Sequence, residues 1–225
     1  MRIARNLAFL VLAVAPSSLC LADNFSFTGN FTHDNDVQIF TFAVGSTSNI
    51  ILRTFSYAGG VDAAGVTIAR GGFDPILSLF SGTGNSASLL LYNDDGAGIP
   101  VDPLTGRRYD TYLTDTIAPG TYTVAVSQYD NFAIGPLFGA GFRRDAEPNF
   151  TSSFGCSNRI FCDVSNVAPY NNRDGHWEFD IDGVNSATQG GGGGGGSVTP
   201  EPSTIALLGT GLLGAAGAIR RRLFA

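Results

Sequence analysis

The chain has 225 residues, enough for one ordinary domain together with terminal signals. Its 30 glycines and 17 phenylalanines, with only 14% charged residues, favour many short strands and turns over helices. Residues 23–199 contain 8 Arg against 18 Asp and Glu, a net charge of −10, so this region repels phosphate and we expect no binding to nucleic acid.

The first 22 residues have the order of a secretory signal peptide. Two arginines precede an apolar run over residues 7–15, and small residues follow that run. We place the cleavage after Ala22, which predicts that the rest of the chain is exported. Lipidation of Cys20 is the alternative, and it is disfavoured because Leu19 stands where a lipobox requires a small residue.

Residues 23–182 show no helical periodicity and instead contain runs typical of β-strands. The expected strands, each bounded by Gly, Asn or Asp turns, cover residues 25–31, 36–44, 49–55, 65–70, 75–80, 88–92, 110–117, 121–128 and 176–182. Their regular spacing predicts an all-β fold, an antiparallel β-sandwich of jelly-roll type over residues 23–189.

The stretch 131–170 has little pattern and is expected to be a loop excursion, although a helix there stays open. It contains Cys156 and Cys162, and two cysteines this close in an exported protein favour a local disulfide over two free buried thiols. The chain has two histidines, His33 and His176, and their spacing with the cysteines fits no zinc site.

The last part of the chain reads as a linker followed by a membrane segment. Seven glycines begin a flexible linker predicted over residues 190–199. Residues 203–219 carry no charge, and 17 residues at about 1.5 Å each are just long enough for a single transmembrane helix. Three arginines follow it and should stay in the cytoplasm, which leaves the domain outside.

The tail from residue 200 to 225 combines a Pro-Glu-Pro triplet, a short apolar helix and a basic end. This combination resembles a PEP-CTERM sorting signal. The resemblance implies recognition and processing by an exosortase, transient anchoring in the inner membrane, and release to the cell surface or extracellular matrix of a bacterium that makes an exopolysaccharide. The residues that carry the motif are Pro200, Glu201, Pro202, Arg220, Arg221 and Arg222.

Three segments of the strand region occur in an order that also resembles a known family. They are the acidic turn at 34–36 before a strand, L-L-L-Y-N-D-D-G at 89–96, and A-P-G-T-Y-T-V-A-V at 118–126. This order is similar to the pre-peptidase C-terminal family of β-sandwich modules. The insertions at 71–75 and 128–131 look like those of a subgroup with PEP-CTERM tails. The resemblance implies a non-catalytic surface module, sometimes calcium-binding or polysaccharide-associated.

Acidic loops at the strand ends are candidates for a calcium site, since calcium takes six to eight oxygen ligands. If the strand that begins near residue 36 and the strand that ends near residue 92 meet at one edge, their loops converge. The alternative is that these side chains only cap turns. The candidate ligands are Asp34, Asp36, Asn93, Asp94, Asp95 and Asp110.

Aromatic residues suggest a second kind of site. Trp177 together with the tyrosines at 92, 109, 112 and 129 could form a sugar-stacking platform, whereas a lone Trp in a terminal strand more often fills a core. His33 beside Asp34 has no accompanying nucleophile motif, and only three Glu residues exist, so we expect no catalysis.

The sequence therefore predicts a non-enzymatic exported protein of the surface or exopolysaccharide matrix. It would be sorted through its tail by an exosortase, with no certain cofactor and calcium as the candidate. A calcium-dependent carbohydrate-binding module is the alternative function. A secreted hydrolase is the third and least favoured. Paired carboxylates for glycoside cleavage stay open, but the chain has only three Glu residues and Glu201 belongs to the tail.

Overall fold

The computed structural model describes residues 23–156, 160–164, 172–190 and 197–200. The predicted signal peptide, six glycines of the linker and the chain from residue 201 onward lie outside the described residues. Five residues of the sorting motif and the predicted transmembrane helix over 203–219 are therefore not described. Within the described part of the chain, no helix has the length and apolarity needed to cross a bilayer.

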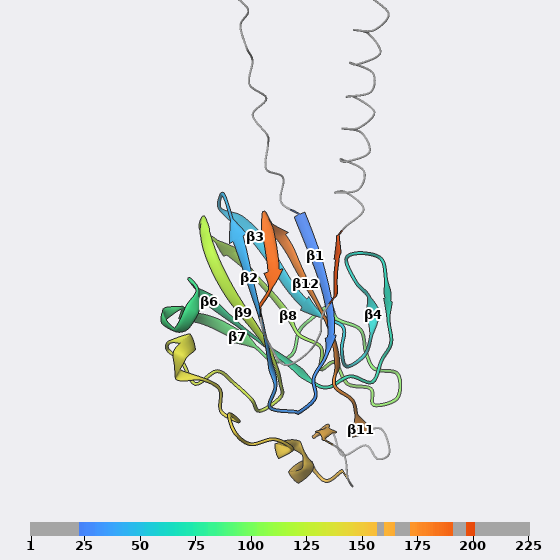
Figure 1. Cartoon of the computed structure of the whole chain (residues 1–225). Coiled ribbons are helices and arrows are strands. Elements are labelled where there is room, and N and C mark those ends of the chain that lie inside the picture. The colour runs from blue at the N-terminus through green and yellow to red at the C-terminus, as the bar shows by residue number, and fades with distance from the viewer. Residues whose placement is uncertain (1–22, 157–159, 165–171, 191–196, 201–225) are drawn as a thin grey trace, which may run out of the picture.

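Strands and three short 3-10 helices make up the described fold (Figure 1). The strands are β1 (Asp23–Asn30), β2 (Val37–Val44), β3 (Ser48–Thr54), β4 (Gly60–Val61), β5 (Thr67–Ile68), β6 (Pro75–Ser81), β7 (Ser88–Asn93), β8 (Tyr112–Ile117), β9 (Gly120–Gln128), β10 (Phe161–Cys162), β11 (Asn172–Arg173), β12 (His176–Val184), β13 (Ser186–Gln189) and β14 (Ser197–Pro200). The 3-10 helices are η1 (Gly84–Ser86), η2 (Phe138–Ala140) and η3 (Phe150–Phe154).

Two five-stranded sheets form a β-sandwich. The first has the strand order β14-β1-β12-β3-β8, and the second has the order β13-β2-β9-β6-β7. All the strand pairs in both sheets are antiparallel. The pairs β4–β5 and β10–β11 form two small additional ribbons. The prediction of an all-β antiparallel sandwich is confirmed.

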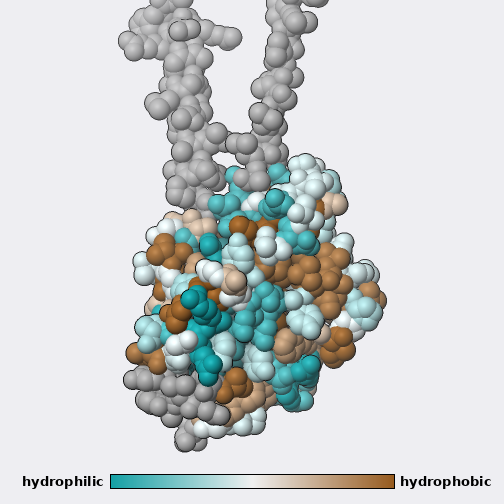
Figure 2. All heavy atoms as spheres, turned by 180° about the vertical axis from the view of Figure 1, so that it is seen from behind, coloured by the Kyte–Doolittle hydropathy of each residue, from teal (hydrophilic) through white to brown (hydrophobic). Residues whose placement is uncertain are grey.

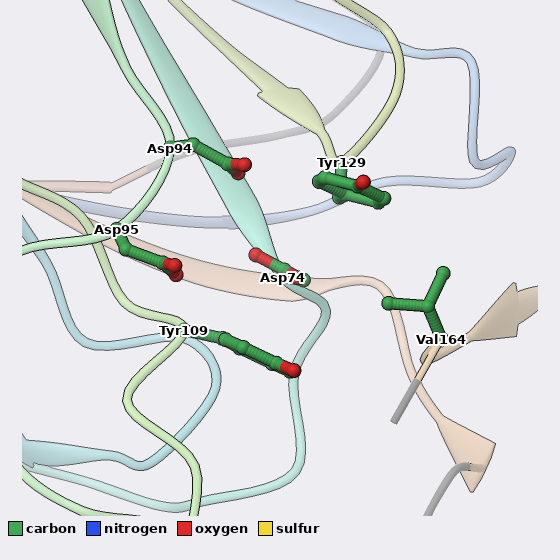
Figure 3. Close-up of a pocket in the computed structure, with 6 residues that line it drawn as sticks. All are labelled: Asp74, Asp94, Asp95, Tyr109, Tyr129 and Val164. Carbon is green, nitrogen blue, oxygen red and sulfur yellow. The ribbon is translucent and has the colours of Figure 1, made fainter. Parts of the chain in front are cut away.

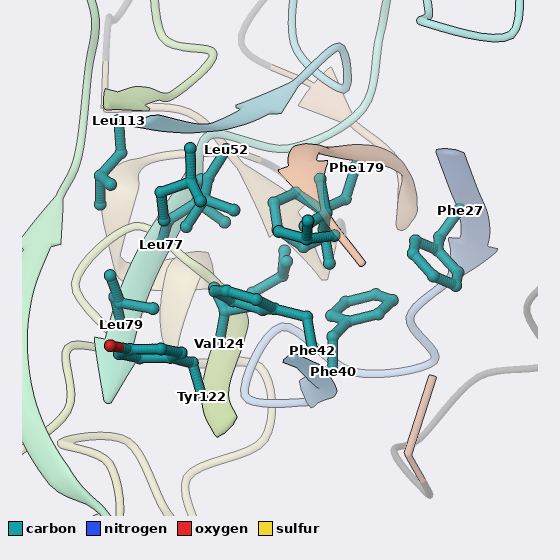
Figure 4. Packing of buried hydrophobic residues seen from close by; sticks show 14 of the residues in the cluster. Phe27, Phe40, Phe42, Leu52, Leu77, Leu79, Leu113, Tyr122, Val124 and Phe179 are labelled. Carbon is teal, nitrogen blue, oxygen red and sulfur yellow. The ribbon is translucent and has the colours of Figure 1, made fainter. Parts of the chain in front are cut away.

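The core lies between the two sheets and is rich in phenylalanine (Figure 4). Phe40 of β2 is fully buried, and its ring centroid lies 4.9 Å from that of Phe27 in β1 and 4.9 Å from that of Phe179 in β12. Alternate residues of β2 are buried, as expected for a strand with one face on the core. Aromatic packing between strands from opposite sheets thus holds the sandwich together.

The nine expected strands all occur, but the segment 65–70 keeps only the two-residue strand β5. The sequence did not indicate β4, β10, β11, β13 or β14. These are short or polar, and each exists because a neighbouring strand offers it backbone partners. The described part of 131–164 has no element longer than η3, in agreement with the predicted excursion.

The chain enters and leaves the sandwich at the same end. β1 begins at Asp23, and β14 runs antiparallel to it so that Pro200 lies opposite Phe25. The last three residues of the predicted linker, Ser197, Val198 and Thr199, therefore belong to a strand. They pair there because β1 has one edge open for pairing. The far end of β1 pairs Asn30 with His176 and lies close to β10 and β11 (Figure 1).

Candidate metal centre

Three aspartates meet because β6 pairs with β7. Asp74 directly precedes β6, whereas Asp94 and Asp95 directly follow β7. The antiparallel register places Leu77 opposite Asn93. The residue before β6 therefore lies beside the residues after β7.

A buried threonine and a glycine keep these two chain segments together. The hydroxyl oxygen of Thr111 lies 2.5 Å from the carbonyl oxygen of Pro75 and 2.7 Å from that of Asp94. The turn after β7 also approaches β8 closely at Gly96, where a Cβ atom would lie 2.6 Å from the backbone nitrogen of Tyr112. Glycine is therefore required there for the acidic turn to sit against the sandwich.

The three carboxyl groups converge on one point (Figure 3). One oxygen from each of Asp74, Asp94 and Asp95 lies within 4.8 Å of the others. Asp74 is only 3% exposed. Its Oδ1 atom, like that of Asp94, accepts no hydrogen bond from any described residue. An unpartnered buried carboxyl group is costly, so this arrangement favours a cation as its partner.

The electrostatics of the cluster lead to the same conclusion. Burial raises the pKa of Asp74 well above its usual range, and the negative charge of Asp94 raises it further. Burial, with Asp95 as the second cause, raises the pKa of Asp94 to about 6, and burial also raises the pKa of Asp95. No basic side chain is among the described residues that line the pocket. A bound cation would relieve these unfavourable interactions.

Calcium is among the ions that fit this set of donors. Its oxygen ligands lie at about 2.3–2.6 Å, so ligands on opposite sides of one ion are roughly 5 Å apart. The span of 4.8 Å between the carboxylate oxygens is within the reach of a single ion. The cluster contains only aspartates, and all-oxygen donors suit calcium, magnesium or manganese rather than zinc. Three carboxylates leave further coordination positions for water or for a ligand.

Two tyrosines flank the carboxylates (Figure 3). Tyr109, Tyr129 and Val164 complete the walls of a pocket of about 190 Å³. Tyr129 directly follows β9, and its backbone N–H donates a hydrogen bond of 2.7 Å to the carbonyl oxygen of Asp74. The ring of Tyr109 packs edge-on against that of Tyr57, with centroids 5.0 Å apart. The pocket is larger than a bare ion requires, which leaves room for hydroxyl groups.

Of the six candidate ligands from the sequence, the structure brings Asp94 and Asp95 into this pocket. Asn93 lies beside it and positions the turn. Its Nδ2 atom donates a hydrogen bond of 2.7 Å to the carbonyl oxygen of Tyr112, and its Oδ1 atom accepts one of 3.0 Å from the N–H of Asp94.

Asp34 and Asp110 lie elsewhere, and both are fully buried acceptors that fix loops. Asp34 accepts hydrogen bonds from the N–H groups of Asn149 at 2.6 Å and Thr151 at 2.7 Å. Asp110 accepts N–H groups from residues 56–58, at distances between 2.6 and 3.0 Å. Their oxygens are already used, so they are not available as ligands in this conformation.

Asp36 caps its own turn. Its Oδ2 atom accepts hydrogen bonds from the N–H of Thr32 at 2.8 Å and of His33 at 2.9 Å. Asp34, Asp36 and Asp110 thus stabilise turns and loops through hydrogen bonds, which was the alternative to a role as calcium ligands. The structure does not bring them together with Asp94 and Asp95.

Asp74 is the member of the cluster that the sequence analysis missed. The segment G-G-F-D-P was noted only as an insertion, and the strand after it was expected correctly. The available signal was the pairing of two consecutive strands, because the residue before the first strand of a hairpin lies next to the residues after the second. The expected meeting of the turn at 34–36 with the strand that ends near residue 92 does not occur, because β9 and β6 separate β2 from β7 in the sheet.

Two further expectations are resolved by the structure. Cys156 and Cys162 form a disulfide with their Cα atoms 5.8 Å apart, as predicted. Trp177 is 1% exposed and packs in the core, so it does not belong to a sugar-stacking platform. Two of the four tyrosines proposed for that platform, Tyr109 and Tyr129, do line the acidic pocket.

Comparison with known proteins finds a match near the C-terminal end of the chain. Residues 198–222 match the PEP-CTERM protein-sorting motif. Neither the curated proteins nor the solved structures gave a match to the chain. Apart from the edge strand β14, the match does not extend into the sandwich, so the resemblance to the pre-peptidase C-terminal family stays a prediction.

Fold and site together define an antiparallel β-sandwich with an acidic pocket at one end. The sorting motif adds that this sandwich belongs to a protein sorted to the surface through an exosortase, with export and membrane-associated processing.

Proposed function

We propose that the chain is a non-enzymatic protein of the bacterial surface or exopolysaccharide matrix, and that its sandwich binds calcium in the acidic pocket. One observation carries the calcium proposal. Asp74 is almost fully buried with an unpartnered oxygen, and this oxygen belongs to a cluster with the carboxylates of Asp94 and Asp95.

The compartment supports calcium over other hard cations. The sorting motif implies a destination outside the cytoplasm, and extracellular calcium modules bind with dissociation constants of about 10⁻⁴–10⁻³ M. Magnesium demands a near-ideal octahedron and keeps several of its waters. A cluster on two loops next to a wide pocket suits the more flexible coordination of calcium.

The two histidines support a non-catalytic role. His176 contacts the carboxylate of Asp174 and the carbonyl oxygen of Ala69, and His33 lies by the turn at Asp36. Neither lines the acidic pocket. Turnover of any substrate in a panel of glycans and peptides would instead favour the hydrolase alternative.

Calcium titration of the full-length chain by calorimetry tests the proposal. We expect one site with millimolar or tighter affinity, together with a calcium-dependent rise in melting temperature. Asp74→Asn should abolish both. Asp115→Asn, which changes an aspartate of β8 outside the cluster, is the matched control and should bind like the wild type. Equal calcium binding by Asp74→Asn and the wild type would refute the site.

The matrix role needs a separate test in cells. We expect an epitope-tagged chain to fractionate with the exopolysaccharide matrix. Replacing the prolines and glutamate of the Pro-Glu-Pro triplet with alanine should retain it in the membrane fraction, because exosortase processing is lost. Release into the medium without any association with the matrix would contradict the matrix role and leave the calcium site untouched.

A further inference from the structure

A row of aromatic rings leads away from the acidic pocket. Tyr129 lines the pocket, and its ring centroid lies 6.1 Å from that of Phe132. The centroid of Phe132 lies 5.5 Å from that of Tyr92 in β7. Leu91, the neighbour of Tyr92 in the strand, packs against the sandwich core. Tyr92 therefore points to the outer face of the second sheet, where it is 58% exposed.

The surroundings of this aromatic row are exposed and apolar. Apolar residues gather on the side of the molecule that carries β6 and β7 (Figure 2). Leu90 in β7 is 47% exposed, and Ile134 in the loop after β9 is 62% exposed. Large exposed apolar groups beside a polar pocket are typical of a binding face. The guanidinium of Arg143 lies 5.0 Å from the ring centroid of Phe132, so the two tyrosines offer the free aromatic surface.

We propose that this face binds a neutral polysaccharide. Two adjacent hydroxyl groups of one sugar would complete the coordination of calcium held by Asp74, Asp94 and Asp95. Neighbouring sugars of the same chain would stack on Tyr129 and Tyr92. This inference rests on the proposed calcium site and names its ligand.

Charge selects a neutral sugar over an acidic one. Three carboxylates and one calcium ion leave a local charge of −1, and residues 23–199 carry a net charge of −10. A uronate carboxylate would add a further negative charge at this point, and like charges brought together oppose binding. Hydroxyl groups can replace calcium-bound water without changing the charge.

The shape of the site suits a sugar chain. The pocket of about 190 Å³ is larger than the ion alone requires. Tyr109 and Tyr129 stand on either side of the carboxylates (Figure 3). Their apolar faces can contact the C–H groups of a sugar ring while their hydroxyl groups offer hydrogen bonds. The row then continues to Tyr92 in steps on the scale of one sugar ring.

Affinity electrophoresis of the full-length chain tests this proposal. Native gels would contain a neutral mannan or a polyuronate, each with millimolar calcium or with EGTA. We expect mannan to slow the protein only in calcium and the polyuronate to slow it less. Tyr92→Ala and Tyr129→Ala should each weaken retention by about tenfold. Because Tyr92 lies outside the pocket, calorimetry of Tyr92→Ala should show unchanged calcium binding.

Two control variants separate stacking from general surface effects. Tyr92→Phe keeps the ring and should behave like the wild type. Val61→Ala removes a side chain of similar exposure, 56%, from β4 on another part of the surface, and should have no effect.

Three results would overturn the proposal while leaving the calcium site intact. These are calcium binding without retention by mannan, stronger retention by the polyuronate than by mannan, and retention that persists in EGTA. An absence of calcium binding in the calorimeter would refute both the calcium site and the sugar contact built on it.

Discussion

Two groups of acidic residues in this protein, one around Asp102 and one around Asp74, differ in their partners. Asp102 is fully buried, and its oxygens receive hydrogen bonds of 2.7 Å from both Arg70 and Arg173. Although burial acts to raise its pKa, these two arginines lower the pKa of Asp102 to about 2. Asp74 is buried to a similar degree but has no arginine in its pocket, and its pKa is raised.

The presence of arginine partners distinguishes a structural contact at Asp102 from a candidate binding site at Asp74. The two arginines neutralise the charge of Asp102, so this group of residues is a structural contact that supports the sandwich. The same region also supports the pocket, because Arg173 lies 3.5 Å from the ring centroid of Tyr57 and Tyr57 packs against the pocket wall at Tyr109. Asp102 has two arginine partners, whereas no basic side chain lines the pocket of Asp74, Asp94 and Asp95 among the described residues. This contrast favours an external cation as the partner of the second group.

Removing the paired acid should have the largest effect on stability. Asp102→Asn leaves the guanidinium of Arg173, whose side chain is 1% exposed, without its nearest charged partner and with only the carboxylate of Asp163 at 3.9 Å. Breaking a buried ion pair in this way costs about 3–5 kcal/mol of unfolding free energy. Denaturant unfolding measures this loss. A loss below about 1 kcal/mol would show that the Asp102 cluster is not a structural contact.

Changing the residue that positions the acidic turn should weaken calcium binding without abolishing it. Asn93→Ala removes hydrogen bonds to Tyr112 and to the N–H of Asp94. Residues that orient metal ligands typically contribute 10-fold or more to affinity. We therefore expect the calcium dissociation constant to rise about tenfold. Calorimetry measures it, and an unchanged constant would mean that the turn holds its shape without Asn93.

Replacing Asp74 should change the free energy of unfolding in the opposite direction from Asp102→Asn. In calcium-free buffer near pH 8, Asp74→Asn replaces a buried carboxyl group by a neutral group of the same shape. We expect a gain of about 1 kcal/mol in unfolding free energy. Chemical unfolding in EGTA measures it. A clear destabilisation in EGTA would indicate that Asp74 has an internal partner.

The pH dependence of stability should also distinguish the clusters. Burial raises the pKa of Asp94 to about 6, with the charge of Asp95 as the second cause, so its unfavourable contribution is full above pH 6 and disappears as the pH falls below the unfolded value near 4. Asp102 has a lowered pKa of about 2, so its favourable contribution is present above pH 4 and is lost as the pH falls through 2.

Calcium-free protein should therefore melt a few degrees higher at pH 5 than at pH 7, and lower again near pH 2. Asp182, whose pKa is raised to about 6 by burial and by Asp180, acts in the same direction as Asp94. The calcium-dependent increment isolates the pocket, because protons compete with calcium for carboxylates. Scanning calorimetry with and without calcium should show that this increment shrinks below pH 6. A constant increment would contradict binding at Asp94.

The sequence predicted the sheets better than the site. The alternation in β2, with Phe40 and Phe42 on one face, predicts a strand without knowledge of its partners. The fate of Asp34 could not be read in the same way, because its hydrogen-bond donors lie at Asn149 and Thr151, more than a hundred residues away. Asp94 and Asp95 were recognised from their turn, but Asp74 joins them only through the register of two strands.

The strand pairing at β1 places the end of β14 and the acidic pocket toward opposite ends of the molecule. Pro200 pairs near the start of β1, whereas the far end of β1 reaches His176, and Asp174 bridges to Gly72, two residues before Asp74. Pro200 thus lies at one end of the sandwich, and the acidic pocket lies near the other end. If the tail anchors the exported protein in a membrane, as the sorting motif implies, this geometry would hold the acidic pocket away from the lipid.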